Sequence, residues 1–402
     1  MGFNLALLGY YKYANFFVDS FNSVGGTSFH LETIILPLGI SFFTFQQIAY
    51  LVDVHRGPPP RYSFLDYCLF VSFFPQLIAG PIVHHAEMLP QFAQERSGRF
   101  DPANLAQGSA IFVIGFFKKV MIADSLARTV NPVFEAAASG AAVGLVDAWA
   151  GSVAYSLQLY FDFSGYSDMA IGIGLMFGIR LPLNFDSPYK ARSIADFWRR
   201  WHMTLSRFLR DYVYIPLGGN RRGELRRYAN LMTTMLLGGL WHGAGWTFVF
   251  WGGLHGLYLS VHHFYQRRRI VWPEGWSALG EFSARFATLV AVVLGWVFFR
   301  AQDFPAAWSL VASMFGAEGL AYDLSLRPGS APWWIGIGLL VALLGPSTQE
   351  MVTDDHKPVR LPFRLEVGGW RPTPLHALIA SVAFFIAVLH LSRANEFLYF
   401  QF

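Results

Sequence analysis

The chain has 402 residues, of which 54% are hydrophobic, 17% are aromatic and only 14% are charged. A soluble domain carries about 25% charged residues, so this composition excludes an ordinary soluble enzyme and predicts an all-α polytopic membrane protein. The net charge is +4 and there is one cysteine, Cys68, which excludes an intramolecular disulfide and a multi-cysteine metal site.

Apolar segments recur along the whole chain, and we treat 1–402 as a single integral-membrane domain. A full crossing needs about 20 residues, so we expect the shorter segments to be short or re-entrant helices. We expect residues 347–373 to form a solvent-exposed connection. The candidate membrane segments are 2–18, 33–52, 64–80, 109–123, 145–179, 228–266, 284–300, 332–346 and 374–392.

Within the segment 145–179, the stretch YFDFSGYSDMA carries two carboxylates, Asp162 and Asp168, in an apolar run. Carboxylates in such a run are either paired with cations or line a polar cavity, and the sequence leaves both open. The glycines here, Gly172 among them, are explained by close packing of helices.

The following region is strongly basic. Residues 180–227 hold 11 Lys/Arg and 4 Asp/Glu, a balance of +7 that leaves −3 for the rest of the chain. Basic segments beside membrane helices mark the cytoplasmic side, so we expect this region to face the cytoplasm. Because membrane segments flank it, nucleic-acid binding is not favoured. Within DFWRRWHMTLSRFLRD (196–211), four arginines could hold an anionic ligand such as a phosphate-bearing acyl donor. The alternative, which composition favours, is an amphipathic surface helix. These arginines are Arg199, Arg200, Arg207 and Arg210.

The segment 228–266 contains no Asp, Glu, Lys or Arg but four histidines. As one helix its 39 residues would extend about 58 Å, nearly twice the thickness of a hydrocarbon core. Its many glycines and the basic residues at both ends predict a broken helix that returns to the side it came from. His242 would then lie near the break.

His242 has only apolar residues and glycine as sequence neighbours. Burial disfavours a charged imidazole, so we expect a neutral base that can accept a proton from a hydroxyl. The alternative is a histidine that only hydrogen-bonds to a neighbouring helix.

His255 has a weaker version of the same pattern, while His262 and His263 are expected at the interface. A zinc site is not favoured, because the H-E-x-x-H spacing and a nearby acidic ligand are absent.

Five ordered blocks of this sequence resemble the membrane-bound O-acyltransferase (MBOAT) family, and within it the branch of bacterial alginate O-acetyltransferases. The similarity extends over nearly the whole chain. The blocks are GISFFTFQQIAYLVDVHRG (39–57), FFPQLIAGPIVHHAEMLPQF (73–92), YFDFSGYSDMAIGIGLMFGI (160–179), DFWRRWHMTLSRFLRDYVYIPLGGN (196–220) and LLGGLWHGAGWTFVFWGGLHG (236–256).

The resemblance implies a multi-helix bundle around a transmembrane tunnel, with re-entrant or broken helices and a donor that enters from the cytoplasm. The essential histidine of the family falls on His242 and a second histidine on His202. The family usually has hydrophobic segments ahead of the block at 7–17, so we expect its N-terminal helices to be missing here. The resemblance makes several further residues candidates for tunnel lining or donor binding: Arg199, Arg200, Trp201, Trp241, His255, Asp162 and Asp168.

The function that the resemblance implies is transfer of acetyl groups across the bacterial inner membrane, for O-acetylation of an alginate-like exopolysaccharide or another cell-envelope glycan. We expect acetyl-CoA or another acyl thioester as donor, with no metal and no tightly bound cofactor. The expected partners are membrane lipid, the glycan acceptor and a periplasmic acetyltransferase protein. One alternative is D-alanyl transfer to teichoic acid from a carrier-protein thioester, which the PLGGN block (216–220) disfavours. Another is a proton-coupled transporter, but no inverted repeat is found.

Overall fold

The computed structural model describes residues 1–57, 62–78, 80–94, 98–268, 277–320, 323, 329–352, 359–360, 366–367, 369–393 and 398. The regular secondary structure in this part of the chain is helical, apart from one antiparallel pair of two-residue strands, β1 (Val359–Arg360) and β2 (Glu366–Val367). The helices up to residue 176 are α1 (Gly2–Leu8), the π-helical turn η1 (Gly9–Tyr13), α2 (Ala14–Gly25), α3 (Ile40–Arg56), α4 (Phe64–Ser72), η2 (Phe74–Gln76), α5 (His85–Phe92), α6 (Pro102–Phe117), the π-helical turn η3 (Lys118–Ala123), α7 (Asp124–Ala138) and α8 (Leu145–Met176).

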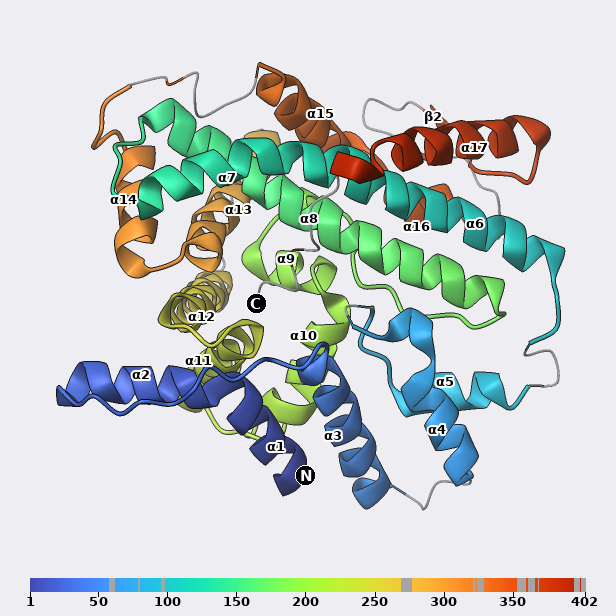
Figure 1. Ribbon diagram of the computed structural model, residues 1–402, viewed down its shortest axis with the longest axis horizontal. Helices are drawn as coiled ribbons and strands as arrows, with labels where there is room; N and C mark the ends of the chain where they lie inside the picture. Colours follow the sequence, from blue (N-terminus) through green and yellow to red (C-terminus); the bar gives the residue numbers. More distant parts are fainter. Residues whose placement is uncertain are drawn as a thin grey trace.

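In Figure 1 the later helices lie near the centre, on the left and along the top of the view. They are η4 (Pro188–Lys190), α9 (Ile194–Arg200), α10 (Met203–Leu209), the π-helical turn η5 (Arg210–Tyr214), α11 (Glu224–His242), α12 (Trp246–Arg267), α13 (Ser277–Arg300), α14 (Phe304–Met314), α15 (Ala331–Leu344), α16 (Thr348–Met351), α17 (Pro374–Leu389) and η8 (Leu391–Arg393).

The long helix α8 runs beside α6, and glycines let the two backbones touch (Figure 1). A Cβ atom added to Gly172 would lie 2.5 Å from the carbonyl oxygen of Gly108, and one added to Gly108 would lie 2.5 Å from that of Gly172. Gly115 and Gly165 meet in the same way further along. The packing role predicted for Gly172 is therefore confirmed.

Asp162 and Asp168 of α8 are paired with lysines of η3. Lys119 Nζ lies 3.0 Å from Asp162 Oδ1, and Lys118 Nζ lies 2.7 Å from Asp168 Oδ2. Of the two open alternatives, pairing with cations is therefore the one observed. Thr348 Oγ1 also donates to Asp168 and is 1% exposed. The prediction that residues 347–373 form an exposed connection is thus wrong at its start, and most of the remainder lies outside the described residues.

The segment 228–266 is broken at Gly243–Gly245, between α11 and α12. The two helices pack so closely that a Cβ on Gly252 would lie 2.3 Å from the carbonyl oxygen of Met235. Only glycine fits there. At the far end of the pair, Glu224 and Arg267 form an ion pair. The predicted break is confirmed, and both ends of the segment lie side by side.

Among the described residues, one helix, Leu279–Arg300, is long and apolar enough to cross a membrane. The nine membrane segments that the sequence predicts are therefore not reproduced one by one. Some apolar stretches form shorter helices, and the segment 33–52 becomes helical only at Ile40. The shorter apolar helices are Phe304–Met314, Ala331–Leu344 and Pro374–Leu389.

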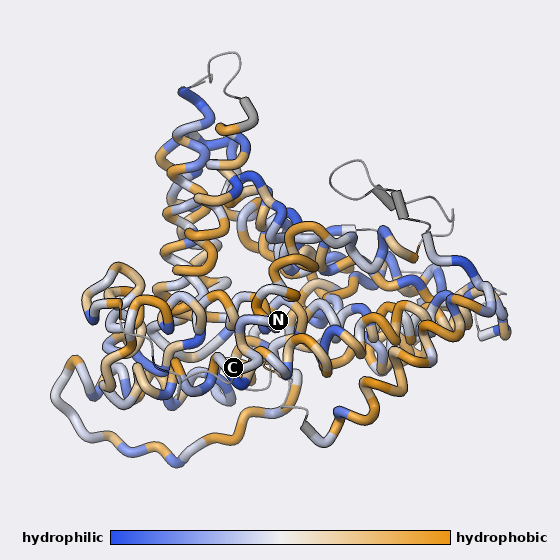
Figure 2. Tube along the Cα trace, turned by 90° about the horizontal axis from the view of Figure 1, so that it is seen from above, coloured by the Kyte–Doolittle hydropathy of each residue, from blue (hydrophilic) through white to orange (hydrophobic). Residues whose placement is uncertain are grey.

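Large apolar side chains cover parts of the outer surface. Leu378, Ile379 and Phe385 of α17 are all exposed, and an apolar surface of this kind marks contact with lipid or another protein. Figure 2 shows α12 and α13 projecting together from the body, with hydrophilic residues at the outer end of α12. This distribution suits a helical membrane protein.

We predict that Gly172→Ala lowers the melting temperature of the protein in detergent. The added methyl group would press on the backbone of α6 and cost about 1–3 kcal/mol. The matched control is Gly336→Ala in α15, where an added Cβ meets no described atom within 4 Å. If both variants melted at the wild-type temperature, the backbone contact between α6 and α8 would be refuted.

Candidate active site

Two histidines from different parts of the chain meet in the interior. His242 is the last residue of α11, and His202 directly precedes α10. The centroids of their rings are 6.3 Å apart. Their exposed fractions are 5% and 0%, so both rings are shielded from solvent.

The ring of His242 is enclosed by aromatic side chains of the next two helices. Its centroid lies 5.2 Å from that of Trp251 in α12, and 5.2 Å from that of Phe299 in α13. The chain leaves the helix at Gly243, whose backbone is extended. His242 is therefore held at a helix end, where its ring meets residues from outside its own helix.

His202 has a left-handed backbone, with φ of 42° and ψ of 53°. Such a conformation is uncommon for residues other than glycine, although histidine is among those that tolerate it. It turns the chain sharply between α9 and α10. Strained positions of this kind concentrate at functional sites, where the surrounding structure holds them.

Asn184 determines how the ring of His202 is protonated. Asn184 Oδ1 lies 3.0 Å from His202 Nδ1 and accepts from the amide and the hydroxyl of Thr204. Because a backbone amide can only donate, this atom is the amide oxygen and must also accept from Nδ1. The hydrogen of a neutral His202 therefore sits on Nδ1, which leaves Nε2 as its acceptor nitrogen.

His255 lies behind Trp251 rather than beside the histidine pair. The centroids of the Trp251 and His255 rings are 4.8 Å apart, and His255 Nδ1 accepts from Trp198 Nε1 at 3.2 Å. A hydrogen bond fixes this imidazole within the aromatic core. Among the described residues, no group of three or more His, Cys, Asp or Glu side chains has an arrangement that could hold a metal.

The two candidate tryptophans are packed in the core. Trp201 stacks on Phe197, with ring centroids 5.6 Å apart, and Trp241 stacks on Phe45 at 5.1 Å. Both are almost fully buried. Each of them directly precedes one of the two histidines in the sequence. Asp162 and Asp168 belong to the lysine pairs of α8, while Phe163, from the same helix, contacts the ring of His202.

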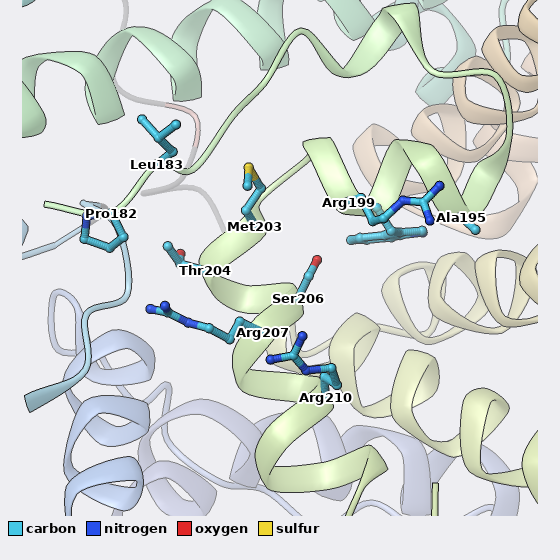
Figure 3. A pocket seen from close by; sticks show the side chains of 10 residues that line it. Pro182, Leu183, Ala195, Arg199, Met203, Thr204, Ser206, Arg207 and Arg210 are labelled. Atoms are coloured by element: carbon cyan, nitrogen blue, oxygen red, sulfur yellow. The ribbon is translucent and has the colours of Figure 1, made fainter. Parts of the chain in front are cut away.

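A pocket of about 510 Å³ lies next to α9 and α10. Three of the four candidate arginines, Arg199, Arg207 and Arg210, line it (Figure 3). Met203 and Thr204, the two residues after His202, form part of the same wall. The pocket thus reaches the stretch of chain that carries one of the two histidines.

The fourth arginine, Arg200, is not among the lining residues and pairs with Asp186 and Asp196. Partial burial raises the pKa of Asp196, but hydrogen bonds from the Arg192 amide and the Arg200 side chain outweigh it and hold that pKa below its ordinary value. Asp196 therefore stays ionised at neutral pH and offsets some of the local positive charge.

Acidic groups also hold the arginines of the pocket. Arg207 makes two hydrogen bonds with Glu87 of α5, and Arg210 bonds to its neighbour Asp211. Arg199 lies 3.6 Å from Asp196, and its side chain is 72% exposed. A guanidinium has five N–H donors, so each arginine retains donors for an anionic ligand.

The residues missed by sequence reasoning are those that orient the histidines. Asn184, Thr204, Trp251 and Phe299 lie in four different segments. One local feature of the sequence could have pointed to such a residue: Asn184 is the single side-chain amide within the apolar stretch LPLNF.

Residues 56–301, more than half of the chain, match the sequence profile of the membrane-bound O-acyltransferase family. The chain belongs to the MBOAT family. This confirms the family that the sequence blocks predicted, and with it a helical membrane protein.

Named relatives of this MBOAT protein are similar over long stretches. It is 49% identical over 343 residues to a peptidoglycan O-acetyltransferase of Helicobacter pylori, covering 79% of this chain and 64% of that relative. It is 41% identical over 422 residues to a probable alginate O-acetylase of Pseudomonas putida, covering 100% of this chain and 83% of the relative. A teichoic acid D-alanyltransferase of Streptococcus thermophilus is 28% identical over 248 residues, 59% of each chain. The chain thus spans less than two thirds of the first of these relatives.

We predict that Asn184→Ala lowers the melting temperature of this MBOAT protein by several degrees. It would leave the His202 ring and the Thr204 hydroxyl without their acceptor, which costs about 1–3 kcal/mol for buried groups. Asn22→Ala is the control, because Asn22 bonds to Thr27 and Phe29 at an exposed position. Equal melting temperatures for the two variants would contradict the orienting role of Asn184.

Proposed function

We propose that this MBOAT protein is an O-acetyltransferase of the bacterial inner membrane. It transfers acetyl groups from a cytoplasmic thioester across the membrane, for O-acetylation of an alginate-like exopolysaccharide or another cell-envelope glycan. The observation that carries the proposal is the buried pair of His242 and His202, one at a helix end and one oriented by Asn184. The two O-acetyltransferase relatives support the acetyl group, because they exceed 40% identity while the D-alanyltransferase is 28% identical.

His242 is the general base of the proposed reaction. Its neutral imidazole accepts the proton of the acceptor's hydroxyl group. At the same time, the oxygen of that hydroxyl forms a bond to the carbonyl carbon of the thioester. The tetrahedral intermediate then collapses, the C–S bond breaks, and the proton passes to the departing sulfur. The products are an ester and a thiol. His202 supports the reaction from the other side of the proposed tunnel, where its ring helps to shape the space in which the acceptor binds.

The reaction exchanges a thioester for an ester without any change of oxidation state. Positioning and proton transfer together supply large rate factors, so neither a metal nor a tightly bound cofactor is part of the proposal. The donor is acetyl-CoA or another acyl thioester. Its anionic part would bind in the pocket beside Arg199, Arg207 and Arg210, because guanidinium groups suit phosphate oxygens.

The remaining parts of the proposal concern topology and partners. A tunnel across a multi-pass bundle would join the donor side to the periplasm, where a partner acetyltransferase completes transfer to the glycan. The basic region 180–227 supports a cytoplasmic position for the donor pocket. The transporter alternative is weaker, since Lys118 and Lys119 hold the carboxylates that a proton relay would need.

We predict that His242→Gln removes at least 99% of the acetyl esters of the envelope glycan, since general-base catalysis contributes about 10²–10⁴-fold. The measurement is ester content after alkaline release, from cells in which the variant is the sole copy. His263→Gln is the control, because it places the same change on α12 away from the pair. Full ester content with His242→Gln would end the enzymatic proposal.

We predict that Arg199→Gln raises the KM for radiolabelled acetyl-CoA in membrane vesicles by about tenfold or more. A hydrogen bond to a charged group contributes about 1.5–3 kcal/mol, and 1.4 kcal/mol corresponds to a factor of ten. Arg192→Gln is a matched control, since that side chain is also exposed, at 65%, but pairs with Glu281. An unchanged KM in the Arg199 variant would exclude the pocket as the donor site.

A further inference from the structure

The N-terminal helical segment contacts the turn that carries His242. Lys12 Nζ donates to the carbonyl oxygen of Trp241 at 2.6 Å and to that of His242 at 3.2 Å. Tyr13 Oη donates to the carbonyl oxygen of Leu240 at 2.9 Å. Three consecutive carbonyl groups at the end of α11 thus have partners more than 220 residues away in the sequence.

These contacts supply hydrogen-bond donors to carbonyl groups at the end of α11. The last four carbonyl groups of an α-helix have no partner within the helix, and leaving them unpaired in the interior is costly. The same end carries the negative pole of the helix dipole, which favours a cation. Lys12 supplies both a cation and hydrogen-bond donors at the end of α11.

The same segment also holds the other side of the break. Ser20 Oγ accepts from the indole nitrogen of Trp246 at 3.0 Å, and the ring centroids of Phe16 and Trp246 are 5.4 Å apart. Trp246 is the first residue of α12. The N-terminal segment therefore spans the turn Gly243–Gly245 and contacts the helices on both sides of it (Figure 1).

The local structure of η1 supports a specific role for Lys12. This π-helical turn, Gly9–Tyr13, interrupts the helix at the residues that reach α11. Isolated π turns are rare and are frequent at functional sites. Lys12 Nζ also lies 3.1 Å from Ser41 Oγ of α3, so one ammonium group joins three helices beside His242.

We propose that Lys12 is a positioning residue for His242, with Tyr13 in support. The inference rests on the proposed function of His242. Because the turn after His242 is Gly-Ala-Gly, the chain itself does little to fix the last turn of α11. Lys12 fixes it from outside, and it thereby sets the position of the imidazole relative to the reacting groups. A displacement of about 1 Å in such a site can cost about 10²-fold in rate.

The test compares Lys12→Met, Lys12→Arg and Tyr13→Phe with Tyr11→Phe, a matched control for which the described residues show no bond to α11. We measure initial acetyl-transfer rates from radiolabelled acetyl-CoA in membrane vesicles, per amount of folded protein, and glycan ester content in cells. We expect Lys12→Met to lower the maximal rate about 10²-fold with an unchanged KM. Lys12→Arg restores most of the rate, since it keeps a cation that reaches the same carbonyl groups, and Tyr13→Phe loses less than Lys12→Met.

Three results would overturn the inference. One is a Lys12→Met protein that works at the wild-type rate. Another is a Lys12→Met protein that accumulates poorly but has the wild-type rate per folded molecule, which would indicate a structural role alone. The last is a Lys12→Arg protein as inactive as Lys12→Met. His242→Gln, measured in parallel, separates the two proposals: if it is inactive while Lys12→Met is active, only the inference fails, and if it is fully active, the proposed function fails.

Discussion

A helix that ends inside a protein must find partners for its last carbonyl groups, and the arrangement of this site depends on how α11 meets that constraint. Its end is stabilised by Lys12 and Tyr13, which lie more than 220 residues earlier in the sequence. Because α11 can end there, α12 can fold back along it through Gly252. His242 therefore stands at a helix end that is buried in the core, where its ring lies beside Trp251, Phe299 and His202.

The second histidine is held by a separate network. Asn184 joins His202 to Thr204, and its own amide group donates to Ser167 of α8. Thr204 also accepts from the backbone amide of Ile82. The position of the His202 imidazole thus depends on three parts of the chain: α8, the segment before α9 and the loop before α5. The two rings meet because two independent sets of hydrogen bonds place them.

The sequence indicated features that depend on local composition. It left open the features that depend on contacts between residues far apart in the sequence. An apolar run too long for one helix predicted the break, and its histidine content made His242 a candidate. The partners of Asp162 and Asp168 stayed open because Lys118 and Lys119 lie in another segment and turn toward α8 only in the folded chain. The left-handed backbone of His202 and its bond to Asn184 follow from tertiary packing, which no local pattern encodes.

The short helix α10 carries both chemical parts of the site. His202 directly precedes it, and Arg207, near its end, lines the pocket. Glu87 holds Arg207, and Asp53 accepts a hydrogen bond from Tyr212, just beyond α10, so α10 is tied to α5 and α3. In the proposed reaction, an anion bound by Arg207 would be positioned relative to His202 through α10. The position of the anion relative to His242 would depend instead on how α10 packs against α11, where Leu209 lies beside Gly238. The end of α11 that Lys12 and Tyr13 hold is therefore the second determinant of the geometry.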